Sequence, residues 1–264
     1  MSDQLQDAAT VVLLRDGSAG LQIYLLHRVA SMAFAAGAHV FPGGRVDPDD
    51  FAVVPWFHPD GGELFSQRAS APEPTARALV VAAVRETFEE SGVLLARHRS
   101  GTVLAADPTG WDALRLALLE RRSTFAQVLS QLNAAIDPTL LPMWDHWVTP
   151  TSEPYRYDTR FHVAALPVGQ ATVEVGGEAD AVVWIEPAGA LSAFRDGSMD
   201  LMPPTVAVLS ALAGYSATAE VMAAAPLRKI RPLLATAVPG GTGERWTLLD
   251  ARTGELVSDS IFFE

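Results

Sequence analysis

The stretch "ALVVAAVRETFEESGVLL", residues 78–95, opens as an apolar helix and then places three glutamates within five positions. Residues three and four apart are neighbours on a helix, so Glu86, Glu89 and Glu90 converge on one face. Like charges at the i,i+4 spacing destabilise a helix by roughly 0.2–0.5 kcal/mol. A solvated charged face, with Arg85 paired to Glu89, is one interpretation of this pattern. A site for a hard divalent cation such as Mg²⁺, which binds a few carboxylates and keeps waters for substrate phosphates, is the other.

The same helix has a regular apolar side. Val81, Val84 and Phe88 share a stripe at about 100° per residue, roughly opposite the carboxylates. Thr75 is the expected N-cap and Gly92 the expected stop. The pattern predicts a helix that packs one face on a sheet while its carboxylates face outward.

Composition limits the classes of function. The 264 residues are 49% hydrophobic, which indicates a folded core, and the formal net charge is −12. Such a charge argues against nucleic acid or an anionic membrane as a partner. The absence of cysteine excludes disulfides, thiolate metal sites and a cysteine nucleophile. With no signal peptide or membrane span in the sequence, a soluble cytoplasmic protein is expected.

The remaining chain alternates between strand and helix patterns. Residues 10–15 and 21–28 predict a hairpin, while 47–74 predict a long surface loop. Two short helices are expected within 110–135, with Ser123 or Thr124 as the cap between them. The other expected elements are strands at 38–44, 92–98, 143–150 and 155–167, a hairpin of 171–175 with 181–187, helices at 187–195 and 203–224, and a tail with β-like pieces.

Two separated segments resemble the Nudix hydrolase box. They are "FPGGRVDPDD" (41–50) and "RETFEESGV" (85–93). The slots of the box are filled by Gly44, Asp50, Arg85, Glu86, Glu89, Glu90, Gly92 and Val93. Asp50 stands where the family usually has Glu, Thr87 occupies a usually aliphatic slot, and residues 51–77 look like an insertion within the box.

One branch of the family is similar in the flanking segments too. The peroxisomal-type coenzyme A diphosphatases and their bacterial relatives resemble this chain in "YLLHRVASMAFAAGAHVFPGG" (24–44) and "WVTPTSEPYRYDTRFHVAALP" (147–167). The resemblance covers about residues 10–190.

The resemblance implies a fold and a domain plan. We expect a Nudix-type α/β/α sandwich with a mixed, curved sheet, formed by residues 1–264 as a single domain. Within it, 51–77 is a loop insertion, 105–142 a helical insertion and 200–264 a C-terminal helical extension.

The resemblance also implies site residues. Glu86, Glu89 and Glu90 are expected to bind Mg²⁺ or Mn²⁺, with Arg85 orienting them. Glu89, Glu90 or Glu178 is expected to help deprotonate the attacking water. Candidate substrate contacts are the phosphate-binding Arg28, Arg45 and Arg160, the turn glycines Gly43 and Gly44, and the groove residues Met32 and Phe34.

The expected substrate is a small nucleoside diphosphate compound. Coenzyme A or acyl-coenzyme A, split into 3′,5′-ADP and (acyl-)4′-phosphopantetheine, is the first expectation, and the chain is a possible homodimer. A broad ADP-ribose or NADH pyrophosphatase, a catalytically silent nucleotide sensor and an acidic interaction protein stay open as alternatives.

Overall fold

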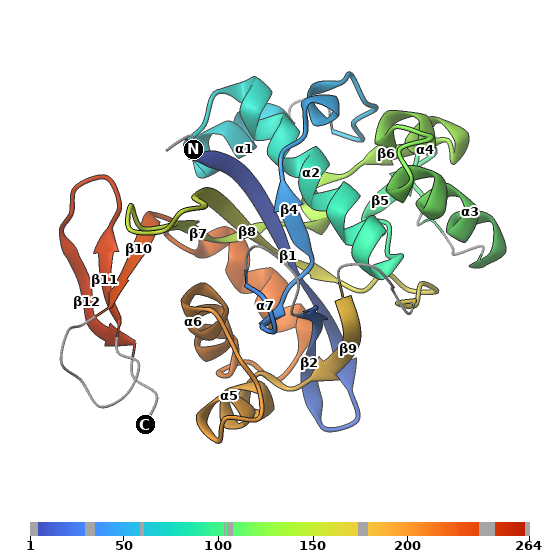
Figure 1. The fold of residues 1–264 in the computed structure, drawn as a ribbon. Helices are drawn as coiled ribbons and strands as arrows, with labels where there is room; N and C mark the ends of the chain where they lie inside the picture. Colours follow the sequence, from blue (N-terminus) through green and yellow to red (C-terminus); the bar gives the residue numbers. More distant parts are fainter. Residues whose placement is uncertain are drawn as a thin grey trace.

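A mixed, twisted sheet runs through the centre of the computed structural model (Figure 1). The structure describes residues 5–29, 35–58, 61–102, 104, 108–173, 179–237 and 246–261. Within them, ten strands form the main sheet in the order β12-β11-β10-β7-β8-β1-β2-β3, with β4 on β1 and β9 on β2. The strands are β1 (Gln6–Gly17), β2 (Gly20–Arg28), β3 (His39–Val40), β4 (Gly43–Arg45), β7 (Met143–Val148), β8 (Tyr157–Ala165), β9 (Ala179–Ile185), β10 (Pro232–Ala237), β11 (Trp246–Asp250) and β12 (Leu256–Ile261).

The long first strand organises two cores. Successive side chains of a strand point to opposite faces. Val11 and Leu13 of β1 accordingly belong to one buried cluster, whereas Val12 and Leu14 belong to the other. The predicted hairpin is confirmed, since β1 pairs antiparallel with β2. On its other edge β1 pairs with β8 in parallel.

Helices cover both faces of the sheet, which confirms the α/β/α sandwich (Figure 1). The first cluster takes its helical residues from the amino-terminal half, and the second from the helices after β9. The helices are α1 (Gly61–Ala69), α2 (Glu73–Ser91), α3 (Pro108–Leu119), α4 (Phe125–Gln131), α5 (Pro187–Arg195), α6 (Pro203–Leu212) and α7 (Thr218–Ala224), with 3₁₀ turns η1 (Pro48–Phe51), η2 (Pro138–Leu140) and η3 (Ala225–Leu227).

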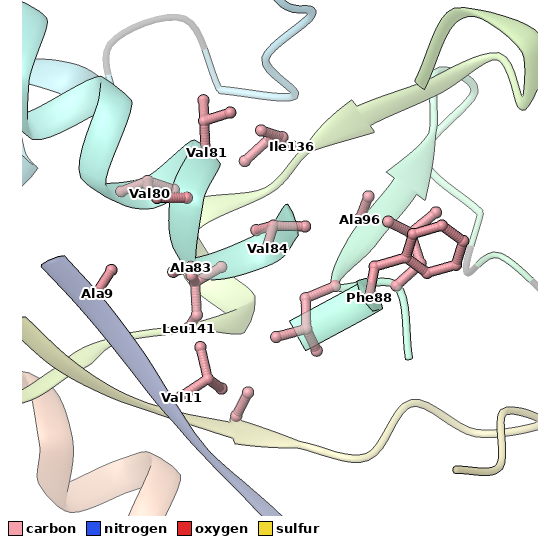
Figure 2. Close-up of a cluster of buried hydrophobic side chains, with 14 of the residues drawn as sticks. Ala9, Val11, Val80, Val81, Ala83, Val84, Phe88, Ala96, Ile136 and Leu141 are labelled. Atoms are coloured by element: carbon pink, nitrogen blue, oxygen red, sulfur yellow. The ribbon is translucent and has the colours of Figure 1, made fainter. Parts of the chain in front are cut away.

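Helix α2 packs as its apolar stripe predicts. Val81, Val84 and Phe88 are buried in the first cluster (Figure 2). The helix ends at Gly92, whose φ of 74° is the left-handed conformation that suits glycine. The predicted N-cap at Thr75 is wrong: α2 already begins at Glu73, because the early proline fits the first turn of a helix.

The predicted loop over 47–74 is wrong, because this segment folds into η1 and α1. Phe65 and Ala69 of α1 are buried in the first cluster. Arg68 donates hydrogen bonds to backbone oxygens that include those of Met143 and Ala225. Among the described side chains of α1, Phe65 is the one large buried anchor, and the sequence of the helix has too little periodicity for it to be predicted. The insertion in the box is therefore part of the packed fold.

The strand expected at 92–98 is confirmed only at its end. There β5 (Ala96–His98) pairs with β6 (Ala134–Ile136) in a separate two-stranded sheet. The two short helices expected within 110–135 are confirmed as α3 and α4, and the cap between them is Thr124, whose side chain accepts a hydrogen bond from Gln127 N. Strand β6, within 105–142, was not expected.

The carboxyl-terminal part departs from expectation in two places. The hairpin of 171–175 with 181–187 is not formed, since 171–173 are not strand and β9 pairs with β2 instead; residues 174–178 lie outside the described part. The helix expected at 203–224 is divided into α6 and α7. The expected extension over 200–264 is also not helical throughout. Strand β10 pairs in parallel with β7, and β11 and β12 follow it at the edge of the sheet in antiparallel pairs. No helix in the described ranges is long and apolar enough to cross a membrane.

Candidate functional site

The acidic face of α2 lines a cavity of about 830 Å³. Glu86, Glu89 and Glu90 all border it, together with residues of β1, β4, β7, β8 and the start of α6. The side chains of Glu86 and Glu89 are only 15% exposed. Charges held away from water in this way cost free energy unless they are paired. The face is therefore not a freely solvated charge run.

A buried ion pair anchors this acidic face. Arg85 Nε donates to Asp50 Oδ1 at 2.8 Å, and Arg85 Nη2 donates to Asp50 Oδ2 at 2.9 Å. Asp50 Oδ2 also accepts from the backbone N–H of Asp47, which fixes the start of η1. Such a two-pronged pair sets the plane of the guanidinium as well as its position. Asp50, whose residue type departs from the Nudix box, is thus a structural partner of Arg85.

The same guanidinium also holds the glutamates. Arg85 Nη1 donates to Glu86 Oε1 at 2.8 Å and to Glu89 Oε2 at 3.1 Å, and its Nη2 donates to the carbonyl of Arg45. One arginine therefore fixes two carboxylates against each other. The orienting role expected for Arg85 needs contacts of this kind, and the role itself stays a prediction.

The electrostatic balance at Glu89 is unfavourable to its charged form. Burial, and then the neighbouring charge of Glu86, raise the pKa of Glu89 to about 7, although Arg85 acts in the opposite direction. For Arg85, burial opposes the charged form, but the hydrogen bond to Asp50 and the charges of Glu86, Asp50 and Glu89 together raise its pKa above the ordinary value. The cluster holds more negative charge than one arginine compensates.

The turn glycines allow β4 to approach α2 closely. The backbone N–H of Gly43 donates to Glu90 Oε2 at 2.7 Å. A Cβ atom on Gly44 would stand 2.3 Å from Glu86 Oε1, and one on Gly43 would stand 2.5 Å from the carbonyl oxygen of Ala9. Both positions thus lack room for a side chain. The glycines, expected to face a ligand, also position the carboxylates.

The predicted arginines separate into two groups. Arg28 and Arg45 line the cavity. Arg160 does not: it is buried, and its Nη1 lies 2.9 Å from both Asp7 Oδ1 and Asp158 Oδ2, while its other nitrogens donate to the carbonyl of Ala69. It therefore links β1 and β8 to the end of α1, and the expectation of a phosphate contact is corrected. Glu178, Met32 and Phe34 lie outside the described residues.

The donor set fits a hard divalent cation in its chemistry. Carboxylate oxygens are the ligands that Mg²⁺ and Mn²⁺ prefer. Because Gly44 has no side chain, it leaves room for the carboxylate of Glu86. Within the described residues, however, no three His, Asp or Glu side chains stand close enough to hold an ion as placed. Arg85 Nη1 bridges Glu86 and Glu89, and Glu90 accepts from Gly43 N. Gathering all three carboxylates on one ion would require their side chains to move closer together.

Several other residues of the cavity wall could not be predicted from the sequence. Arg121 and Phe125 come from the 105–142 insertion, and Trp147, Tyr157 and Trp246 from three strands. They share no local motif, because only the fold brings these segments together. Asp50, by contrast, could be found from the sequence, because it fills the acidic slot of the Nudix box directly before the insertion.

The chain is similar to known proteins over much of its length. A model of the family described as the NUDT19 Nudix domain matches residues 63–212. Acyl-coenzyme A diphosphatase NUDT19 of Gallus gallus is 29% identical over 239 residues, covering 76% of this chain and 63% of the relative. The protein of the same name from Homo sapiens is 29% identical over 240 residues, with the same coverage. The chain thus spans about 63% of the length of these curated relatives.

A solved structure supports the fold independently. The crystal structure of a NUDIX hydrolase from Alicyclobacillus acidocaldarius is 29% identical, with a TM-score of 0.66, covering 83% of this chain and 96% of that one. The resemblance in the box and in its flanks is therefore confirmed. Since the family model covers more than half of the chain, this protein belongs to the Nudix family, in the branch described by the NUDT19 Nudix domain.

Proposed function

We propose that this chain is a divalent-metal-dependent hydrolase that cleaves the diphosphate of coenzyme A or acyl-coenzyme A, giving 3′,5′-ADP and (acyl-)4′-phosphopantetheine. The observation that carries the reaction type is the set of three α2 glutamates on the wall of a large cavity, two of them held by Arg85. The choice of substrate rests on the relatives named acyl-coenzyme A diphosphatase.

In this proposal Glu86, Glu89 and Glu90 hold Mg²⁺ or Mn²⁺. The ion would supply charge that stabilises the diphosphate oxygens and lowers the pKa of a bound water. Arg85 keeps Glu86 and Glu89 in a fixed relative orientation through its Nη1. Asp50 in turn fixes Arg85 from behind, as an outer partner of the kind that tunes metal sites.

A proton acceptor for the attacking water is available on the same helix. A general base works best when its pKa lies near the operating pH. Burial and Glu86 raise the pKa of Glu89 to about 7 in the ion-free chain, and a bound ion would lower it from there, so Glu89 is the first candidate for this role. Glu90 and Glu178 stay as the other candidates for this role.

The size and lining of the cavity suit a long substrate. A volume of about 830 Å³ lies within the range of roughly 300–1,000 Å³ that is usual for ligand sites. Arg28 and Arg45 offer positive charge on the wall of the same cavity. An apolar chain would find the side chains of Leu118, Leu119, Phe125, Phe161 and Met202 on the walls.

The test is a substrate panel assayed with and without Mg²⁺ or Mn²⁺. It includes coenzyme A, an acyl-coenzyme A, 3′-dephospho-coenzyme A, ADP-ribose and NADH, with products identified by mass spectrometry. We expect metal-dependent release of 3′,5′-ADP from coenzyme A. If ADP-ribose or the dephospho form is turned over ten times better, the coenzyme A assignment fails and only the diphosphate hydrolysis survives. If none of the compounds is turned over in a metal-dependent reaction, the proposed activity is rejected.

Glu90→Gln provides the matching active-site variant. A neutral amide is a poor ligand for a hard cation, so we expect turnover to fall at least about a hundredfold with the fold intact. Glu73→Gln is the control, because Glu73 lies on the same helix but is 53% exposed and pairs with Arg77. Near-wild-type turnover by Glu90→Gln at saturating metal would contradict its place in the site.

A homodimer in the cytoplasm completes the proposal. Size-exclusion chromatography with light scattering tests the first part, and fractionation of cells that express the chain tests the second.

A further inference from the structure

The turn between α3 and α4 holds an arginine in an unfavourable backbone conformation. Arg121 follows the last turn of α3, and its φ is 55° (the two helices are labelled in Figure 1). The left-handed region is costly for a side chain with a Cβ atom, and glycine or asparagine usually fills it at a helix end. The sequence nevertheless has a long cationic residue there. Strain of this kind often accompanies a functional position.

The side chain of Arg121 lies at the cavity. It is 80% exposed, its Nη2 stands 3.6 Å from Asp47 Oδ2, and both residues line the cavity. At this distance and exposure an ion pair contributes little to stability. The pair therefore does not account for an arginine at a strained position.

Positive charge is scarce on the cavity wall, so an anionic substrate depends on its few arginines. The acidic residues on the cavity wall are Asp47, Asp49, Asp50, Glu86, Glu89, Glu90 and Glu153, whereas the basic ones are Arg28, Arg45, Arg85 and Arg121. Arg85 is engaged by carboxylates of the α2 cluster. Arg121, by contrast, has a weak partner that a phosphate can replace, because a guanidinium matches the geometry of phosphate oxygens.

We propose that Arg121 binds a substrate phosphate that lies outside the diphosphate being cleaved. This inference rests on the proposed function, in which the α2 glutamates bind the ion that holds the diphosphate. Among the described residues the ion pair of Arg121 is with Asp47, and not with those glutamates. In coenzyme A the group outside the diphosphate is the 3′-phosphate, so Arg121 determines the preference for 3′-phosphorylated nucleotides.

The test compares substrates that differ only in this phosphate. We measure kcat/KM for coenzyme A and for 3′-dephospho-coenzyme A with wild type, Arg121→Gly, Arg121→Lys and Asp47→Asn. Arg121→Gly should lower the ratio of the two values about tenfold, while turnover of the dephospho form stays near wild type. Its Tm should not fall, because glycine relieves the left-handed strain. Arg121→Lys should keep part of the preference, and Asp47→Asn should raise it by freeing the guanidinium.

Arg122→Ala is the matched control. Arg122 is the next residue, 62% exposed and paired with Glu120, and it does not line this cavity. An unchanged ratio in Arg121→Gly, or an equal change in Arg122→Ala, would overturn the inference. So would an equal loss on both substrates, since that pattern indicates a structural role or a contact with the diphosphate.

A binding measurement separates this inference from the reaction itself. Calorimetry with 3′,5′-ADP and with 5′-AMP needs no turnover. Tighter binding of 3′,5′-ADP that Arg121→Gly abolishes would support the inference even if the substrate panel showed no hydrolysis. Equal affinity of wild type for the two nucleotides would overturn it while leaving the diphosphate hydrolysis intact.

Discussion

The pair between Asp50 and Arg85 gives a prediction whose size follows from the contacts. Asp50 is 2% exposed and accepts three hydrogen bonds, two from Arg85 and one from the Asp47 backbone. Removing one partner of a buried ion pair costs about 3–5 kcal/mol. In Asp50→Asn the guanidinium keeps Glu86 and Glu89, so we expect the lower end, about 3 kcal/mol. At about 2–4 °C per kcal/mol for a chain of this size, Tm should fall by roughly 6–12 °C.

The assay is thermal unfolding with saturating Mn²⁺, combined with metal-dependent turnover. The exposed pair of Glu73 and Arg77 on the same helix, 2.9 Å apart, is the control. Surface pairs contribute at most about 1 kcal/mol, so Glu73→Gln should change Tm by less than about 4 °C. A loss in Asp50→Asn no larger than that of the control would refute the reasoning.

A double substitution separates stability from orientation. Replacing a buried pair by apolar residues of similar volume is often neutral, so Asp50→Leu combined with Arg85→Met should regain much of the Tm. Turnover should not recover, because Glu86 and Glu89 lose the nitrogen that holds them together. Recovery of turnover together with Tm would show that Arg85 has no orienting role.

Two further predictions follow from the site and from α1. Because the folded-state pKa of Glu89 is raised to about 7, its contribution to the stability of the ion-free protein should be present at pH 4 and lost as pH rises through 7. Melting curves with EDTA should show this loss in wild type and not in Glu89→Gln, and an equal pH dependence of the variant would contradict it. Replacing 51–77 with a short Gly/Ser link should lower Tm by several degrees, because Phe65 is buried in the core and none of the described side chains of this segment lines the cavity; unchanged Tm with altered KM would reverse that view.

The parts of the fold that could be predicted have local and repeated patterns. The stripe of α2 and the stop at Gly92 depend on residues within a few turns of each other, so periodicity reveals them. The hairpin of β1 and β2 depends on a short turn between two β-rich runs. The carboxylates were found for the same reason, because three glutamates on one helical face form a local pattern.

The parts that could not be predicted depend on contacts between distant segments. Arg160 carries the same charge as Arg28 in the sequence, but Asp7, Asp158 and the carbonyl of Ala69 surround it in the fold. Arg121 lines the cavity only because the fold places the 105–142 insertion next to η1. In each case the environment is assembled from elements more than 70 residues apart, and no window of sequence contains it.

The charge count at Arg85 explains why this cluster is suited to a divalent ion. Asp50, Glu86 and Glu89 contact one guanidinium, so the buried group carries a formal charge of −2 when all three are ionised. Burial, and then the charge of Glu86, raise the pKa of Glu89, so protonation is the way the ion-free cluster reduces this excess. A divalent cation balances the same two charges and would allow Glu89 to ionise at neutral pH. The like-charge repulsion on α2 is therefore tolerable in a protein that works with its ion bound, and it would be a plain cost in one that does not.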